Sequence, residues 1–346
     1  MRNLYDKILG GLLGGATGDA MGAATEIRTT KMIVEKWGHI LTEIEQAPED
    51  TWAHWSKRGQ VTDDFSVSYY HVLQFIKDKG KITEKGAKKA VLDWYKDPNY
   101  SQCAGPTTRA AIARMQGKKL PPDKHDRLLC VNSRATNGAA MKVGCIGLFD
   151  AGNVDKAIDD AITMCKVTHD NTIALAGACA IAAATAEAMK DRVSYLDVIE
   201  AGIYGAEQGF LRSSKLEDVH PVAGADIVRR IRHAVDLGMR YQGRFDEAMD
   251  ILAREIGGGL PANEAVPAAF GYIAATKGNA MDTIVMAVNA GDDTDTVACM
   301  AGYIVGALNG YNRIPDRFLK LIEKENNFDL RKSAREIEKL LLKEGK

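Results

Sequence analysis

The stretch Ala290-Gly291-Asp292-Asp293-Thr294-Asp295-Thr296 is the most informative part of this 346-residue sequence. Its last five residues carry three carboxylates and two hydroxyls, and the run that follows, 297–308, is apolar or small throughout. Such a run is typical of a fully buried helix. Gly302, Gly306 and Gly310 recur every four residues. One face of this helix is therefore bare, and a second backbone can lie close against it.

The acidic residues at the start of this helix have two interpretations. Asp and Thr are good N-caps, and the helix dipole favours negative charge at this end. A cap needs one acid, however, whereas this helix start has three and leads into a buried element. Burying unpaired carboxylates is costly unless a cation neutralises them. The stretch therefore indicates a cation site, with an ordinary cap as the alternative.

A second acidic cluster supports the cation site. Thr62-Asp63-Asp64 directly precedes an apolar stripe at helical spacing that begins with Phe65 and Tyr69. If the two clusters meet, they bring at least four carboxylates and two hydroxyls together. These are hard oxygen ligands, which suit Mg²⁺ or Mn²⁺ and not zinc. Two divalent ions would roughly neutralise four carboxylates, and two-metal sites hydrolyse or transfer groups at oxygen-rich substrates.

Composition narrows the class of protein. Hydrophobic residues make up 46% of the chain, and the net charge is −1 with no basic stripe, which argues against a nucleic-acid partner. No run of 18 apolar residues predicts a membrane span. The apolar segment near the N-terminus lacks a signal-peptide pattern, so we expect a cytoplasmic protein. The six cysteines form no Cys-x-x-Cys pair, which favours reduced core cysteines over a disulfide framework or a zinc site.

Nearly every periodic segment predicts a helix, and strand signals are weak. We therefore expect an all-α fold, and the absence of repeats, linkers and boundaries predicts a single domain over residues 1–346. Six glycines in the first predicted helix indicate close packing, and Asp19 among them is unusual for an ordinary core. The expected helices cover 3–22, 63–79, 84–97, 153–166, 170–190, 193–212, 223–240, 244–255, 279–290 and 328–343, and Pro261 and Pro267 start or join a further helix.

Three further segments are candidate substrate contacts. Gly105-Pro106-Thr107 opens a helix, where it is either an ordinary cap or a set of backbone N–H groups facing a phosphate. Asn137-Gly138 marks a turn before a helix rich in small residues that includes Met141. His169 lies at another helix start, where a histidine is commonly a capped side chain. Phosphate-binding P-loop and dinucleotide-binding glycine motifs are absent from the sequence.

These motifs together resemble the ADP-ribosylglycohydrolase family, and they occur in the family's order over nearly the whole chain. The motifs are Gly18-Asp19 followed by Glu26, Thr62-Asp63-Asp64, Asn137-Gly138-Ala139-Ala140-Met141, Thr168-His169, and Asp293-Thr294-Asp295-Thr296. The resemblance implies an orthogonal multi-helix bundle with a dinuclear cleft that holds two Mg²⁺ or Mn²⁺. The implied metal ligands are Thr62, Asp63, Asp64, Asp293, Asp295 and Thr296.

The resemblance also implies catalytic roles. Glu26 would act as a general acid/base or would position the attacking water, although a loop acid of this kind is otherwise simply solvated. Asp63 or Asp64 could share the base role. The candidate substrate-binding residues are Gly105, Thr107, Asn137, Gly138, Met141 and His169.

Three positions depart from the family pattern. Phe65 follows the first metal motif where the family usually has Thr, Lys142 stands where Arg is frequent, and Asp292 stands where Gly is common. Lys lacks the planar fork of Arg, so we expect Lys142 to matter only if the substrate carries phosphate. The departures leave the predicted ligands in place and concern the substrate side.

The expected activity is metal-dependent hydrolysis of a ribosyl C1 bond, in an ADP-ribosylated protein or a small ADP-ribosyl conjugate. Cleaving that bond builds positive charge on the sugar, as in glycoside hydrolysis. One alternative is a nucleoside or other N-riboside hydrolase on the same scaffold. An alternative of another class is a non-catalytic ADP-ribose-binding or structural protein. No nucleic-acid or membrane partner is expected.

Overall fold

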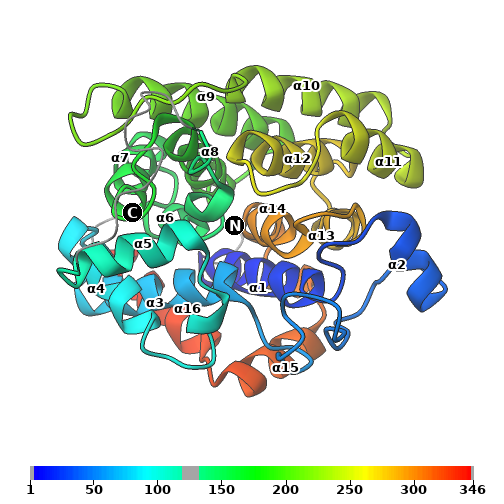
Figure 1. Ribbon diagram of the computed structural model, residues 1–346, viewed down its shortest axis with the longest axis horizontal. Helices are drawn as coiled ribbons and strands as arrows, with labels where there is room; N and C mark the ends of the chain where they lie inside the picture. The colour runs from blue at the N-terminus through cyan, green and yellow to red at the C-terminus, as the bar shows by residue number, and fades with distance from the viewer. Residues whose placement is uncertain (1–3, 119–131, 344–346) are drawn as a thin grey trace.

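The structure is a computed structural model that describes residues 4–118 and 132–343 (Figure 1). The described residues form 16 α-helices and no strand, which confirms the all-α prediction. The helices are α1 Leu4–Gly22, α2 Thr30–Trp37, α3 Asp63–Lys77, α4 Glu84–Trp94, α5 Pro106–Met115, α6 Gly144–Phe149, α7 Val154–Cys165, α8 Thr172–Ala188, α9 Tyr195–Ser213, α10 Ile227–Arg240, α11 Phe245–Glu255, α12 Ala262–Ala275, α13 Ala280–Asn289, α14 Thr294–Asn309, α15 Asp316–Asn326 and α16 Leu330–Lys343.

Helices α1 and α14 lie side by side at the centre of the bundle (Figure 1). Their glycines meet backbone to backbone. A Cβ added at Gly14 would overlap the carbonyl oxygen of Gly302, and one added at Gly302 would overlap that of Gly14. Gly10 and Gly306 face each other in the same way. The glycine spacing that predicted a bare helix face therefore serves this contact.

The Ala-rich helix α8 forms a second buried layer. Every residue of α8 except Glu187 is buried, and the helix packs against α7, α9, α6 and α14. One continuous apolar cluster runs from Ile8 in α1 to Leu341 in α16. Within the described residues, no helix is both long and apolar enough to cross a membrane.

The expected helices are all present, with ends that shift by a few residues, and two helices were not expected. Helix α2 buries only Ile33, so it has no apolar stripe to signal it. Helix α15 begins after Pro315 and is highly charged on its exposed side. The expected single helix after Asn137 is instead a short 3₁₀ turn, Asn137–Ala139, followed by α6. Residues 140–143 separate this turn from α6.

We predict that Gly14→Ala destabilises the protein by about 3 kcal/mol, because the added methyl overlaps the Gly302 backbone and must push the two helices apart. Gly177→Ala in α8 is the matched control. Its methyl would meet only side-chain methyl groups, the nearest at 3.1 Å. Both substitutions gain the same helix propensity, about 1 kcal/mol. Equal urea midpoints for the two variants would contradict the central role of the α1–α14 contact.

Candidate active site

The two acidic clusters meet at the N-termini of α3 and α14, as the sequence predicts. The Thr296 hydroxyl donates to Asp64 Oδ1 at 2.6 Å, and the Thr62 hydroxyl donates to Asp64 Oδ2 at 2.8 Å. The Thr62 hydroxyl also lies 3.4 Å from Asp295 Oδ2. Segments more than 200 residues apart thus share one hydrogen-bonded centre, in which Asp64 is held from both sides.

Asp19 fixes the start of α3 against α1. Its carboxylate accepts the backbone N–H groups of Thr62 at 2.8 Å and Phe65 at 2.7 Å, and the residue is fully buried. Asp19 therefore accepts two backbone N–H groups that have no partner within α3. The sequence carried a signal for this role, because an acid within a glycine-rich buried helix needs a partner.

Glu26 reaches the centre through a strained pair of loops. Ile27 N–H donates to the Asp292 carbonyl at 2.8 Å, and Asp292 N–H donates to the Arg28 carbonyl at 2.9 Å. Ile27 and Asp292 have φ values of 59° and 66°, in the left-handed region that favours glycine. This explains why a glycine suits the position of Asp292. The pairing places the Glu26 carboxylate beside the start of α14.

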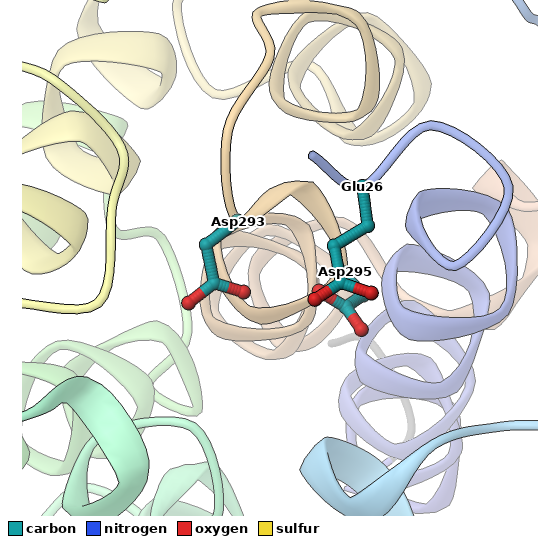
Figure 2. Close-up of side chains that lie close together, drawn as sticks. All are labelled: Glu26, Asp293 and Asp295. Atoms are coloured by element: carbon teal, nitrogen blue, oxygen red, sulfur yellow. The ribbon is translucent and has the colours of Figure 1, made fainter. Parts of the chain in front are cut away.

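The carboxylates of Glu26, Asp293 and Asp295 converge on one point (Figure 2). Each offers one oxygen, and the three oxygens all lie within 4.8 Å of one another. Asp293 and Asp295 come from the start of α14, and Glu26 comes from the loop after α1. Within the described part of the chain, this is a group of acids that could hold a metal ion.

Burial dominates the electrostatics of the centre. It raises the pKa of Glu26 to about 9, with the charge of Asp293 as the next cause, and it raises the pKa of Asp64 to about 7. Burial also raises the pKa values of a further group of acids: Asp19, Asp63, Asp293 and Asp295. The hydrogen-bond donors to Asp19, Asp64 and Asp293 are backbone N–H groups, hydroxyls and an amide. An all-oxygen donor set with this excess of negative charge fits Mg²⁺ or Mn²⁺.

Asn137 belongs to the acidic centre as well as to the expected substrate side. Its side-chain amide donates to Asp293 Oδ2 at 2.6 Å, and its backbone N–H donates to the Leu260 carbonyl at 2.8 Å. Asp293 N–H in turn donates to the Gly258 carbonyl at 3.3 Å. Gly258 and Leu260 were not among the predicted site residues, and no motif in the sequence marks them.

A cavity adjoins the centre and contains some of the predicted substrate contacts. Its polar and glycine lining comes from α3, α5 and the segments before α6 and α8: Asp63, Thr108, Gly138, Lys142 and Thr168. Val67, Val91, Trp94 and Met141 complete it.

The remaining predicted contacts lie elsewhere. Gly105 is the N-cap of α5 and Thr107 lies in its first turn, but Thr108 is the residue of this helix that lines the cavity. His169 is buried and sits against Gly138, because a Cβ added at Gly138 would lie 2.8 Å from His169 Nε2.

Comparisons with known proteins agree with this fold. The family model described as ADP-ribosylglycohydrolase matches residues 1–345. The uncharacterized protein YegU of Escherichia coli (strain K12) is 28% identical over 332 residues, covering 95% of each chain. ADP-ribosylhydrolase ARH3 of Bos taurus is 24% identical over 349 residues, covering 92% of this chain and 88% of the relative.

A solved structure described as an ADP-ribosylglycohydrolase-related protein complex superposes with a TM-score of 0.63 at 22% identity, covering 98% of this chain and 99% of the other. The family match over residues 1–345 makes the protein a hydrolase of the glycosidase class, acting on ribosyl bonds. The chain belongs to the ADP-ribosylglycohydrolase family.

We predict that the cation-free protein loses stability as pH rises. The folded-state pKa values of Asp64 and Glu26, about 7 and about 9, exceed the ordinary values of 3.8 and 4.5. Between these limits the folded state binds more protons than the unfolded state, so the free energy of unfolding falls with increasing pH. A bound divalent cation neutralises the carboxylates and so removes this loss of unfolding free energy at high pH. The rise in melting temperature on adding Mg²⁺ should therefore be larger at pH 8 than at pH 5.5.

The matched variant is the double substitution Asp293→Asn/Asp295→Asn, which keeps the side-chain shapes and removes two charges. It should lose most of the response to Mg²⁺ at both pH values. If the wild type responds equally at both pH values, or the variant responds like the wild type, the cation site is not at the start of α14.

Proposed function

We propose that the chain is a Mg²⁺- or Mn²⁺-dependent hydrolase that cleaves the ribosyl C1 bond of an ADP-ribosyl conjugate, on a protein or a small molecule. The observation that carries the proposal is the convergence of Glu26, Asp293 and Asp295 on one point, with their oxygens within 4.8 Å of one another. Burying these acids together is costly without a cation. Two divalent ions would neutralise the four carboxylates proposed as ligands, those of Asp63, Asp64, Asp293 and Asp295.

The proposed ligands come from the two helix starts: Thr62, Asp63, Asp64, Asp293, Asp295 and Thr296. Two hydroxyls donate hydrogen bonds to Asp64, and the Asn137 side-chain amide donates one to Asp293. These hydrogen bonds support the assignment, because they orient carboxylates that would otherwise repel one another. When bound, such ions supply electrostatic stabilisation of oxygen-rich groups and the ordering of water.

We assign Glu26 the role of general acid/base. Burial and the charge of Asp293 raise its pKa to about 9, so the side chain carries a proton at neutral pH in the cation-free protein. Charge neutralisation at Asp293 and Asp295 would lower that pKa toward the range in which a carboxyl exchanges protons efficiently. Glu26 can then take a proton from the attacking water or give one to the leaving group. Asp63 lines the adjoining cavity and could share the base role.

ADP-ribosyl substrates are favoured by the family and by the similarity to the relative ADP-ribosylhydrolase ARH3. Hydrolysis of nucleosides or other N-ribosides is the second candidate. It is favoured by one observation: the Lys142 ammonium, the cation expected to contact phosphate, is buried and bonds inside the protein to Gly138 and Thr168.

A cytoplasmic location and a single domain complete the proposal. The free thiols of the described cysteines support a reducing compartment, and Cys130 lies outside the described residues. The continuous apolar cluster from α1 to α16 supports one domain.

The substrate is tested with ADP-ribosyl-arginine, an ADP-ribosyl-serine peptide and a panel of nucleosides, each with Mg²⁺ and with chelator. We expect metal-dependent release of ADP-ribose from at least one of the two conjugates, and loss of that activity in Asp64→Asn. Activity on nucleosides alone would favour the second candidate. Tight ADP-ribose binding without any metal-dependent hydrolysis would favour a binding protein.

We predict that Glu26→Gln lowers kcat by about 10²–10⁴-fold while the Kd for ADP-ribose changes little, because a general acid/base acts mainly in the transition state. Glu35→Gln on α2 is the control, since that side chain is exposed and distant from α14. Binding is measured by calorimetry and turnover by product release. A Glu26→Gln variant that keeps wild-type kcat would show that Glu26 has no catalytic role. A variant that loses kcat only together with Mn²⁺ binding would show that Glu26 is a metal ligand instead.

A further inference from the structure

Lys142 is a buried cation close to the acidic centre and without a carboxylate partner in its hydrogen bonds. Only 2% of the residue is exposed. Its ammonium donates to the Gly138 carbonyl at 2.7 Å and to the Thr168 hydroxyl at 3.0 Å. Burying an ammonium against neutral acceptors is costly. A lysine retained in such a place therefore needs a reason other than stability.

The two acceptors of Lys142 belong to one hydrogen-bonded ring of side chains and backbone. The Thr168 hydroxyl lies 2.9 Å from His169 Nδ1, and His169 Nε2 lies 3.0 Å from the Thr136 hydroxyl. Burial lowers the pKa of His169 well below its ordinary value. The imidazole is therefore neutral, with one donor nitrogen and one acceptor nitrogen. Thr136 and Gly138, at the two ends of this chain of bonds, flank Asn137.

Asn137 connects this ring to the acidic centre. Its side-chain amide donates to Asp293 Oδ2 at 2.6 Å, so the direction of the amide sets the orientation of that carboxylate. On the other side, the backbone N–H of Asn137 is fixed to the Leu260 carbonyl at 2.8 Å. The Lys142 bond to Gly138 fixes the opposite end of the same turn. Asn137 is therefore held from both directions.

We propose that Lys142 is a positioning residue that holds the Asn137–Gly138 turn so that the Asn137 amide orients Asp293 for cation binding. This rests on the proposed function, because it takes Asp293 as a cation ligand. Lys142 acts through backbone and neighbouring side chains rather than by contact with substrate.

Three variants test the proposal. Lys142→Met removes both donors at similar volume, and Lys142→Arg restores them. Lys7→Met is the matched control, because Lys7 is also buried and its ammonium also donates to backbone carbonyls. These are the carbonyls of Ala188 at 2.6 Å and Lys190 at 3.0 Å, at the C-terminal end of α8. A general cost of losing a buried lysine should appear in both methionine variants.

Two measurements are made on the full chain. Mn²⁺ affinity is measured by titration with detection of free Mn²⁺ by electron paramagnetic resonance. Amide hydrogen exchange of residues 136–141 is measured in the presence of chelator. We expect Lys142→Met to weaken Mn²⁺ binding by about tenfold or more, as for other groups that orient metal ligands, and to speed exchange in this segment. Lys142→Arg should stay close to the wild type, and Lys7→Met should change neither property.

Wild-type Mn²⁺ affinity and wild-type exchange in Lys142→Met would overturn the proposal, as would equal losses in Lys7→Met. If Lys142→Met does not fold, Thr168→Val removes one of the two acceptors and should shift both properties in the same direction. Failure of the wild type itself to bind Mn²⁺ would contradict the proposed metal centre. The exchange measurement in chelator would still decide whether Lys142 holds the turn.

Discussion

The close contact between α1 and α14 is the constraint on which the rest of the structure depends. Because glycines face each other along both helices, the backbones touch without intervening side chains. At the end of the contact, a Cβ on Gly18 would overlap the Ala298 carbonyl oxygen and one on Gly22 would overlap Asp295. The end of α1 is thereby pressed against the start of α14. Asp19, the Glu26 loop and the acids of α14 follow from that placement.

This packing concentrates negative charge where it is hard to solvate. The bundle offsets part of the cost with backbone N–H groups at helix starts and with hydroxyl and amide donors to the carboxylates. The raised pKa values of Glu26 and Asp64 show that these donors do not offset all of it. The remaining demand for positive charge is what links the fold to the proposed cation chemistry.

Much of the fold and the acidic centre could be predicted from the sequence, because the signals are local. Acids that precede an apolar helix are visible at Thr62-Asp63-Asp64 and Asp293-Thr294-Asp295-Thr296, and the glycine spacing indicates a bare helix face. Contacts that depend on the path of a loop were not predictable. The pairing of Ile27 with Asp292 uses left-handed backbone at residues with no glycine to signal it.

Side-chain direction was the other limit. Thr108, next to the predicted contact Thr107, lines the cavity, and the Lys142 ammonium bonds to Gly138 and Thr168. Neither contact was predicted. Thr108 lies in the first turn of α5, and Lys142 lies between the 3₁₀ turn Asn137–Ala139 and α6. A hydrophobic pattern does not define side-chain directions in such segments.

The central claim is that the starts of α3 and α14 together hold a pair of divalent ions. Electron paramagnetic resonance of the protein loaded with Mn²⁺ tests it most directly, because two ions about 3.5–4 Å apart are magnetically coupled. The account predicts a coupled spectrum that saturates at two Mn²⁺ per chain in the wild type and is absent from Asp293→Asn/Asp295→Asn. A spectrum of isolated Mn²⁺ only, or a coupled spectrum unchanged in that variant, would contradict it.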